Sequence, residues 1–443
     1  MRLDPSIRWR PLLVWSLGLI AIAIPAAAQT TTDPTLVVTP FVTGLSQPIA
    51  MAFLGPDDFL VTQKANGQVR RVIAGVLQPG NVLDVNVNSS SERGLLGIAI
   101  QQGTPIRVFL YYTEAQGSDG GTPLGNRVYR YDWNPAGPGS LVNPQMILDL
   151  PVTPGPNHNG GQMVLDGSGL LYLVMGELNR NGQLQNFPAG APPDDTGVIF
   201  RVNSDGTAAA GNPYTPYCSI TTTTTCTQTA DCPGGETCTT QVARYLEYGL
   251  RNSFGLTFDP MTGALWDTEN GPNVMDEVNL VTPGLNSGWE QIMGPDALDP
   301  QGVGDLWNMP GAGLTYSDPE FSWNQTVAPT GILFPVGSTW GPSYDNVVLV
   351  GDNNLGNLYA LPLNGSRTGF DFSATPALLD LVADTQAEAN LVRLGQGFGP
   401  GGGGITDIKL GPDNDVYFVA IGNGTIYRIH GPVPVELQGF SVE

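Results

Sequence analysis

Histidine is scarce in this chain, and one of its two histidines lies in a segment that could do chemistry. His158 stands in NHNGGQ, between two asparagines and before a pair of glycines, whereas His430 follows the last apolar run near the C-terminus. Imidazole is the side chain whose unperturbed pKa lies nearest neutral pH, so His158 is the best candidate for a general base. The alternative is a structural role in its loop, with the ring bonded to backbone carbonyls.

A second candidate is the pair Arg251–Asn252 in the segment GLRNSFG. A guanidinium and an amide held in fixed positions can polarise a carbonyl oxygen or bind a developing oxyanion. On its own, such a pair more often braces a loop. Its interest therefore depends on whether the fold brings it to face His158.

A third candidate is an oxygen-rich turn in the segment TENGPNVMDEVN, which contains Asn270, Gly271, Pro272, Asp276 and Glu277. The Gly-Pro turn leaves carbonyl oxygens free to point at a cation, and mixed side-chain and backbone oxygens suit Ca²⁺. The spacing is not that of an EF-hand loop. A solvated acidic turn explains this pattern about as well as a metal site does.

Charge and motif content exclude several classes of function. The 40 acidic residues outnumber the 18 Lys and Arg residues, which gives a net charge of −22 and makes nucleic acid an unlikely partner. The sequence contains no GxSxG, no HExxH and no Walker-type phosphate loop. Nucleotide cofactors and the familiar hydrolase sites are therefore disfavoured.

The N-terminus resembles an export signal. Arginines precede a short apolar run and an Ala-Ala-Ala-Gln cleavage site, so residues 1–28 are predicted to be a signal peptide and residues 29–40 a linker. The apolar run is shorter than a spanning helix needs, and no later run approaches that length, so no membrane span is expected after cleavage. These features predict a secreted or periplasmic protein.

All four cysteines fall in a Thr-rich insertion, residues 215–241. In an oxidising compartment such a cluster favours two local disulfides, for which three connectivities are possible. A Cys₄ metal site is the alternative, although the spacings do not fit paired CxxC knuckles. We assign the insertion no catalytic role.

Self-similarity organises the rest of the chain. The 58 glycines and 38 prolines argue against long helices, and one pattern of short alternating strands recurs six times, starting at Met51, Ile98, Met163, Leu256, Ile332 and Ile408. The pattern predicts an all-β, six-bladed β-propeller over residues 41–431, with four-stranded antiparallel blades around a central channel and a C-terminal tail, 432–443. A pair of β-sandwiches is the competing architecture.

Unusual polar residues collect just before the first strand of each repeat. Because equivalent loops of a propeller lie on one face, these segments are expected to converge at one mouth of the channel. They are SQPIA at 46–50, SERGLLG at 91–97, NHNGGQ at 157–162, GLRNSFG at 249–255, NQTVAPTG at 324–331 and GGGGITD at 401–407.

Three long segments resemble one known family. NHNGGQMVLDGSGLLYLVMGE, YGLRNSFGLTFDPMTGALWDTENGPNVMDEVNLVTPGLNSGW and SERGLLGIAI are similar to, and ordered as in, the soluble PQQ-dependent glucose/sorbosone (aldose sugar) dehydrogenases, over about residues 41–430. That resemblance implies a six-bladed propeller that binds pyrroloquinoline quinone (PQQ) above Ca²⁺ and oxidises an aldose to its lactone. It also implies an external electron acceptor, and we consider a homodimer possible.

The resemblance assigns roles by position. His158 would take the sugar hydroxyl proton while hydride passes to the quinone, and Arg251 with Asn252 would bind the quinone oxygen. Calcium would be held by Asn270, Gly271 and Pro272, with a further ion near Asp276 and Glu277. The other residues placed at the cofactor are Glu92, Arg93, Trp323, Thr326 and Thr406.

The chain also departs from the family pattern. The basic residues that usually meet the quinone carboxylates are missing from GDNNLGN in the fifth repeat and from Gly404-Ile405-Thr406-Asp407 in the sixth, and Glu92 stands where a neutral amide is common. Arg93 is a candidate to compensate. These departures keep open a non-catalytic propeller that binds glycans or proteins. A Ca²⁺-dependent lactonase is a third, less favoured hypothesis.

Overall fold

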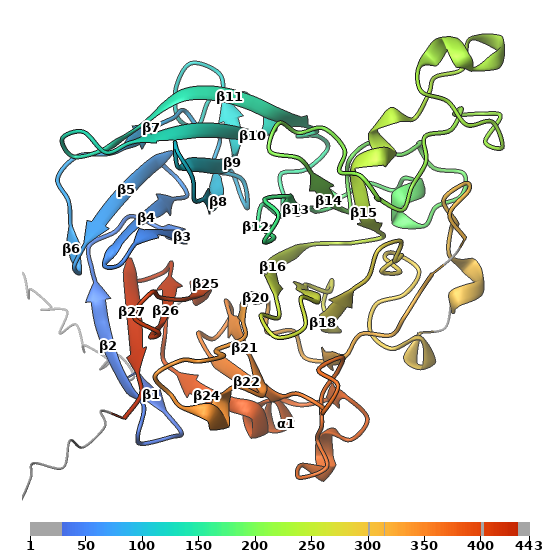
Figure 1. The fold of residues 1–443 in the computed structure, drawn as a ribbon. Coiled ribbons are helices and arrows are strands. Elements are labelled where there is room, and N and C mark those ends of the chain that lie inside the picture. The colour runs from blue at the N-terminus through green and yellow to red at the C-terminus, as the bar shows by residue number, and fades with distance from the viewer. Residues whose placement is uncertain (1–28, 300–301, 314, 400–402, 433–443) are drawn as a thin grey trace, which may run out of the picture.

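Six sheets stand around a central axis in the computed structural model, which describes residues 29–299, 302–313, 315–399 and 403–432 (Figure 1). The innermost strands of successive sheets are neighbours, and β25 (Ile405–Leu410) also contacts β3 (Pro48–Gly55), which closes the ring. The predicted six-bladed propeller is thereby confirmed. The expected signal peptide and nearly all of the expected tail lie outside the described residues.

The blades follow the chain, and each repeat supplies the innermost strand of its own blade. Blades 1 to 3 comprise β3, β4 (Asp58–Gln63), β5 (Gln68–Ile73), β6 (Val76–Leu77) and β7 (Leu83–Asp84); β8 (Leu95–Gln101), β9 (Arg107–Ala115), β10 (Pro123–Asn134) and β11 (Ser140–Leu150); and β12 (Met163–Leu165), β13 (Leu171–Met175), β14 (Val198–Val202) and β15 (Tyr245–Tyr248).

Blades 4 to 6 each include one strand from a distant part of the chain, namely β23, β1 and β2, respectively. They comprise β16 (Ser253–Phe258), β17 (Leu265–Glu269), β18 (Asp276–Val281), β19 (Phe321–Trp323) and β23 (Val382–Ala383); β20 (Pro329–Leu333), β21 (Val347–Asp352), β22 (Leu358–Pro362), β24 (Arg393–Gln396) and β1 (Thr30–Thr31); and β25, β26 (Val416–Ala420), β27 (Thr425–His430) and β2 (Val37–Val42). Strand pairing within the sheets is antiparallel except for β23, which pairs with β19 in parallel.

The N-terminal segment joins the ring instead of leading up to it. We expected a linker at 29–40, but residues 30–31 form β1 on the edge of blade 5, and β2 pairs with β27 as the outer strand of blade 6. The second strand of the described chain, β2, thus completes the last blade. Such pairing satisfies backbone groups that an open edge would leave exposed.

Alternating side chains pack each blade against its two neighbours. In β13, Leu171, Leu173 and Met175 belong to the apolar cluster shared with blade 2. The intervening Tyr172 and Val174 belong to the cluster shared with blade 4. The alternation of apolar residues in the sequence repeats reflects this period of two. Because both faces of each blade are packed, the blade is a rigid support for the loops that connect its strands.

Helices are short and lie outside the blades. Within the described ranges the helices are α1 (Gln386–Ala389) and the 3₁₀ turns Gln183–Gln185, Thr229–Asp231, Pro233–Gly235, Thr240–Arg244, Asp296–Leu298, Val303–Asp305, Pro342–Tyr344, Pro376–Leu378 and Asn390–Val392. None of these has the length and apolar character of a membrane-spanning helix.

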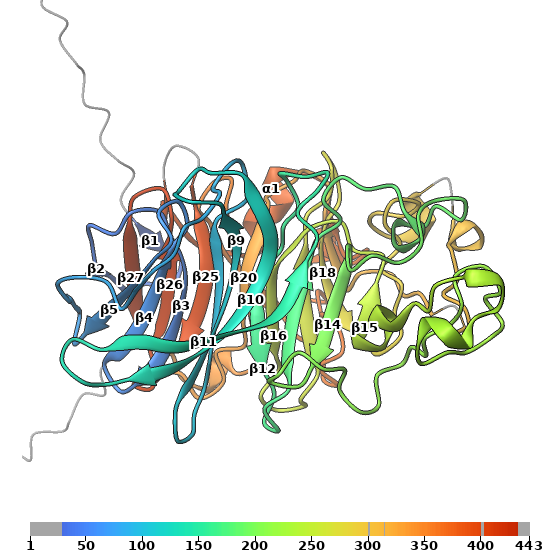
Figure 2. The same ribbon diagram turned by 90° about the horizontal axis from the view of Figure 1, so that it is seen from above.

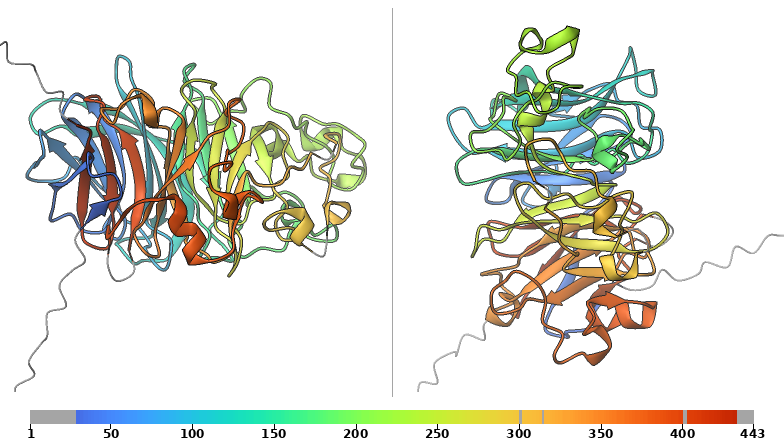
Figure 3. Two further views of the ribbon diagram at one scale, coloured as in Figure 1. Left: turned by 90° about the horizontal axis from the view of Figure 1, so that it is seen from below. Right: turned by 90° about the vertical axis from the view of Figure 1, so that its right-hand side faces the viewer.

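The cysteine insertion extends from the rim of the ring, as the edge-on views show (Figures 2 and 3). Its disulfides join Cys218 to Cys232 and Cys226 to Cys238, so the pairing is interleaved. Because both pairs are oxidised, the thiols are not available as metal ligands. The disulfide prediction is confirmed, and the connectivity that the sequence left open is resolved.

A buried ion pair joins blade 4 to blade 5. Arg367 Nε and Nη2 donate to the two carboxylate oxygens of Asp259 at 2.7 and 2.9 Å, and the Asp259 side chain is fully buried. We expect Arg367→Met to leave that carboxylate buried without its cation and to lower the free energy of unfolding by about 3–5 kcal/mol in denaturant titrations.

The matched control is Arg127→Met, whose two partners Asp149 and Glu114 both reach solvent, with 53% and 27% of their side chains exposed. Exposed pairs contribute about 0–1 kcal/mol, so the control should lose much less stability. Equal losses in the two variants would contradict the account of Arg367.

Candidate active site

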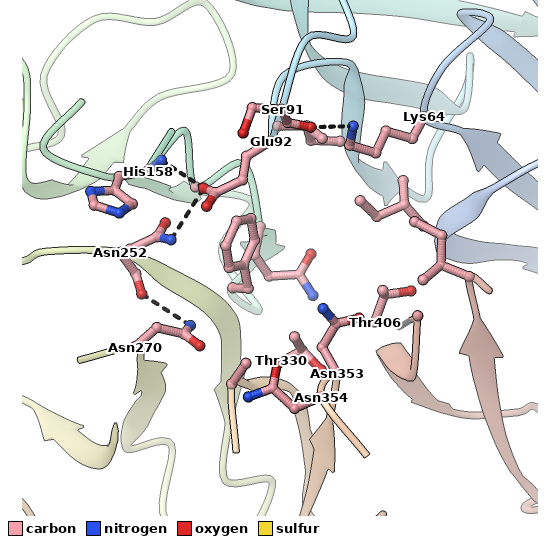
Figure 4. A pocket seen from close by; sticks show the side chains of 18 of the residues that line it. Lys64, Ser91, Glu92, His158, Asn252, Asn270, Thr330, Asn353, Asn354 and Thr406 are labelled. Carbon is pink, nitrogen blue, oxygen red and sulfur yellow. Dashed lines mark hydrogen bonds between the residues drawn. The ribbon is translucent and has the colours of Figure 1, made fainter. Parts of the chain in front are cut away.

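One mouth of the channel holds a cavity of about 670 Å³. Residues from all six converging segments line it, as predicted, and Figure 4 shows their side chains around the opening. These residues are Gln47, Ile49, Ser91, Glu92, Leu96, His158, Gly160, Gln162, Arg251, Asn252, Phe254, Thr326, Ala328, Thr330, Gly403 and Thr406.

His158 is held against a carboxylate that sequence reasoning missed. Its Nδ1 hydrogen bonds to Oε1 of Glu177, which follows β13 and is only 2% exposed. A carboxylate accepts a hydrogen bond from Nδ1–H, which leaves Nε2 as the ring nitrogen that can accept a proton. His158 lines the cavity. The arrangement therefore orients the imidazole for proton transfer at the cavity.

The backbone around His158 is tightly constrained. His158 has a φ of 59°, in the left-handed region that non-glycine residues rarely adopt. A Cβ on Gly176 would lie 2.3 Å from the His158 carbonyl oxygen and 3.0 Å from that of Arg251. Glycine at 176 thus permits the two predicted site segments to approach each other at the end of β13.

Glu92 is hydrogen bonded both to the predicted base, His158, and to Asn252 of the predicted anion-binding pair. Its Oε2 accepts hydrogen bonds from the backbone N–H of His158 at 2.6 Å and from Nδ2 of Asn252 at 3.2 Å (Figure 4). A neutral amide in this place could not offer two such charge-assisted bonds from one oxygen. The substitution noted in the sequence therefore organises the mouth in this chain.

Arg251 and Asn252 carry unsatisfied polar atoms at the cavity. Nε of Arg251 and Oδ1 of Asn252 are buried without a hydrogen-bond partner in the described structure. Burial lowers the pKa of Arg251, opposed by the nearby carboxylates. Buried polar atoms are nearly always paired, so these two indicate a polar ligand or ordered water in the cavity.

The oxygen-rich turn faces Arg251. Nη1 of Arg251 donates to the carbonyl oxygens of Asn270 at 2.8 Å and Gly271 at 3.1 Å. Asp276 fixes the turn, since its carboxylate accepts backbone hydrogen bonds from Gly271, Val327 and Ala328. Burial raises the pKa of Asp276 to about 6. The two carbonyls are thus aimed at a cation, which here is the guanidinium.

Three further polar side chains at the mouth were not predicted as site residues from the sequence. Lys64 lines the cavity from the loop after β4, and its Nζ donates to the Ser91 carbonyl at 2.7 Å. Asn353 and Asn354 line it from the loop after β21, and Oδ1 of Asn353 is buried without a partner. Lys64 is one of only two lysines in the chain, which is the signal that could have found it.

Four predicted site residues are absent from the cavity lining. Arg93 is buried and donates to the carbonyl of Val152, and Trp323 packs between Phe321 and Tyr359 on the apolar side of β19. The remaining two are Glu277, which accepts the Gly294 N–H, and Pro272, which is exposed beyond the turn. The geometry does not bring Arg93 or Trp323 to a ligand at the mouth, because their side chains point into packed protein.

The buried carboxyl group of Asp352, at the end of β21 below the mouth, is expected to make the stability of the fold depend on pH. Burial raises its pKa from 3.8 to about 6, against the opposing effect of hydrogen bonds from Leu355, Asn357 and Tyr359. Folding therefore favours the protonated form. The resulting stabilisation, about 3 kcal/mol, is complete below the unfolded pKa and is lost as pH rises through about 6.

We expect Asp352→Asn, which cannot ionise, to remove this dependence. In urea titrations between pH 4 and 7, the variant should gain stability relative to the unmodified protein as pH rises. A difference that stays constant across this range would contradict the assignment to Asp352.

The chain is similar to known proteins over most of its length. The sequence profile described as Glucose / Sorbosone dehydrogenase matches residues 45–222 and 228–428. Aldose sugar dehydrogenase YliI of Escherichia coli is 25% identical over 336 residues, which cover 74% of this chain and 80% of the relative. Quinoprotein glucose dehydrogenase B of Acinetobacter calcoaceticus is 25% identical over 273 residues, which cover 56% of this chain and 51% of the relative.

A solved structure supports the fold. The PQQ-bound form of aldose sugar dehydrogenase from Streptomyces coelicolor superposes with a TM-score of 0.59 and 22% identity, covering 91% of this chain and 99% of that one. At this identity the similarity establishes the propeller and leaves the ligands of this chain to be argued from its own residues.

Proposed function

The chain belongs to the glucose/sorbosone dehydrogenase family, and from that premise we propose that it is a quinoprotein that oxidises an aldose-type sugar to its lactone, using PQQ and Ca²⁺. The observation that carries the proposal is the meeting, in one cavity, of a carboxylate-oriented imidazole and the unsatisfied Arg251–Asn252 pair. A base for the proton of the sugar hydroxyl, and donors for the negative charge that develops when the carbon bearing it gives up a hydride to the cofactor, are the two functions that this oxidation requires.

The residues present fit a flat, anionic cofactor. Of the orphaned atoms on residues that line the cavity, Nε of Arg251 is a donor for an anionic group, whereas Oδ1 of Asn252 and Oδ1 of Asn353 can only accept hydrogen bonds from N–H or O–H groups of a ligand; Lys64 adds a second cation to the lining. Lys64 is also the residue that can meet a cofactor carboxylate where the fifth and sixth blades offer no base. Bound PQQ supplies a two-electron acceptor.

The turn fits a calcium ion at the same mouth. Asn270, Gly271 and Pro272 would hold it through their oxygens, which are the hard ligands that Ca²⁺ prefers. Arg251 now donates to two of those carbonyls, so binding of the ion requires its guanidinium to turn toward the cofactor. Asp276 keeps the turn in place, and we propose no second ion at Glu277, which is engaged by Gly294 and Asn279.

The chain's own residues would handle the proton and the charge. Nε2 of His158 accepts the proton of the sugar hydroxyl, and the Glu177 carboxylate stabilises the imidazolium that results. Glu92 fixes the backbone of His158 and the amide of Asn252, so the base and the oxygen-binding group keep their separation. Arg251 and Asn252 donate to the oxygen on which negative charge develops.

The setting of the reaction follows the sequence-based predictions. We propose export to the periplasm or medium, in agreement with two disulfides on the rim. The reduced enzyme would pass electrons to an external acceptor, and a homodimer is its proposed assembly.

Reconstitution tests the function directly. Purified protein is incubated with PQQ and CaCl₂, and aldose-dependent reduction of a dye is followed together with the visible spectrum. Micromolar cofactor binding with dye reduction supports the dehydrogenase. Absence of cofactor binding would remove it in favour of the non-catalytic, glycan- or protein-binding propeller.

A further inference from the structure

The faces of blades 3 and 4 that meet below the mouth are rich in carboxylates. Pairing places Asp267 opposite Asn279, and Glu269 opposite Glu277, in β17 and β18. Leu265 and Val281, which pair on the same side of these strands, pack against blade 3, so this side faces blade 3. Glu247 approaches it from β15, where it pairs with Ile199 of the same apolar cluster.

Two of these carboxylates make no hydrogen bond of ordinary geometry, although Ser287 lies near Glu247, and Ser253 and Asn279 lie near Asp267. Glu247 and Asp267 are both 0% exposed, and all four of their oxygens lack a hydrogen bond in the described structure. Leaving even one buried polar atom unpaired is unfavourable, and an ionised carboxylate is far more so. Four orphaned oxygens in one layer therefore indicate a ligand between the blades.

No protein cation neutralises them. Neither Glu247 nor Asp267 takes part in any ion pair of the described chain. Instead, Asp267 and Glu269 are the charges acting most strongly on Glu247, and both repel its ionised form. Burial, above all, raises the pKa of Glu247 well above its usual range and that of Asp267 to about 7.

We propose that a calcium ion binds between blades 3 and 4, with Glu247 and Asp267 as its carboxylate ligands. Neutral oxygens stand beside both groups. The hydroxyl of Ser287 lies next to Glu247, and the side-chain amide of Asn279 lies next to Asp267. Nδ2 of Asn279 already donates to Glu277, which leaves Oδ1 as a ligand atom.

The chemistry of the donor set selects the ion. Apart from the disulfide-bonded cysteines, no three His, Cys, Asp or Glu side chains of the described chain bring their ligand atoms within 4.8 Å of one another. The proposed shell therefore has two carboxylates and is completed by amide, hydroxyl and water oxygens. An all-oxygen, irregular set suits Ca²⁺, whereas Mg²⁺ demands near-ideal octahedral geometry and Zn²⁺ favours nitrogen and sulfur.

This site is separate from the turn at the mouth. Its ligands come from the middle of β15 and β17, and neither Glu247 nor Asp267 lines the cavity. The ion would hold the two blades together through opposite charges in a buried layer. Its expected role is stability, and the proposal stands whether or not the protein binds a quinone.

Metal counting with a matched control tests the proposal. The full chain, expressed with its signal sequence, is dialysed into calcium-free buffer, and bound calcium is measured by mass spectrometry. The test variant is Glu247→Gln with Asp267→Asn, and the control is Asp352→Asn. Asp352 is equally buried but is hydrogen bonded to Asn357 and Tyr359.

We expect the test variant to retain one calcium fewer per chain than the unmodified protein and the control. Thermal melting of the unmodified protein should fall on addition of a chelator and recover with CaCl₂, and the test variant should show a smaller response to both. If the double variant does not fold, Asp267→Asn alone replaces it in the same count, because calcium at the turn of the mouth would also make the unmodified protein respond to a chelator.

Two results would overturn the proposal. One is equal calcium content in the unmodified protein and the test variant. The other is melting of the unmodified protein that neither a chelator nor CaCl₂ changes, which would mean that protons alone neutralise the layer. Neither result bears on PQQ binding, so this proposal and the proposed function fail independently.

Discussion

Replacing His158 with Gln is expected to lower the kcat of the PQQ-loaded protein for aldose oxidation by about 10²–10⁴-fold, the usual contribution of a positioned general base. Glutamine can fill the space and hydrogen bond to Glu177, but it cannot accept the proton that imidazole takes on Nε2. Cofactor binding, followed by the visible spectrum, should change little. A kcat within tenfold of the unmodified enzyme would contradict the assignment.

Glu177→Gln separates orientation from proton transfer. Glu177 holds Nδ1 of His158 and also accepts the Arg180 N–H, so the amide keeps most of the packing. Because the amide cannot stabilise the imidazolium as the carboxylate does, we expect kcat to fall, but by less than in His158→Gln, while KM changes little. A purely structural role would raise KM and weaken cofactor binding as well.

The second large effect is expected at Arg251. Its guanidinium has an unpaired Nε at the cavity and lies 5.2 Å from the ring of Trp289. Arg251→Met keeps the apolar contact but removes the charge, so kcat should fall by about 10²–10³-fold, the effect of deleting one preorganised oxyanion donor. Steady-state kinetics with saturating PQQ and CaCl₂ measure this loss.

Arg251→Lys is the matched control, since it keeps the charge and loses the planar fork. Its kcat should lie between those of the Met variant and the unmodified protein. Calcium is added in excess because Arg251 also contacts the turn carbonyls. If the Met variant kept full kcat under these conditions, Arg251 would have no part in stabilising the developing charge.

Much of the fold was predictable because each blade of the propeller appears in the sequence as a similar run of alternating residues. Strands of a blade alternate apolar side chains toward two neighbours, so six similar runs predict six blades, and the loops before their first strands must share a face. That inference brought His158, Arg251 and Thr406 to one cavity across 248 residues of sequence (406 − 158). The N-terminal strands were missed because VVTPFV contains a proline, which reads as irregular chain.

The failures at the site have a different physical origin. Trp323 lies in a three-residue strand, too short for its sequence to show which side faces the channel. Arg93 follows Glu92 directly, but its guanidinium bonds to Val152, a partner 59 residues away that no local pattern specifies. Loop side chains are directed by such distant contacts, so spacing identifies their segment without fixing their direction.

Glu177 and Lys64 are residues of the site that the sequence pattern did not single out. Each follows the second strand of its blade, a position that the pattern of polar segments before the first strands did not include. Both reach the mouth because the second strand runs antiparallel to the first and ends beside the place where the first begins. The loop after the second strand is therefore the additional position to inspect in sequences of this fold.

Rapid mixing of the PQQ- and calcium-loaded protein with an aldose, in the absence of any dye, tests the central claim most directly. The account predicts that the absorbance of the bound quinone changes to that of its reduced form in a single turnover, and that His158→Gln slows this change by about 100-fold or more at equal cofactor occupancy. Reduction at the same rate in both proteins, or no reduction by any aldose despite bound PQQ, would contradict it.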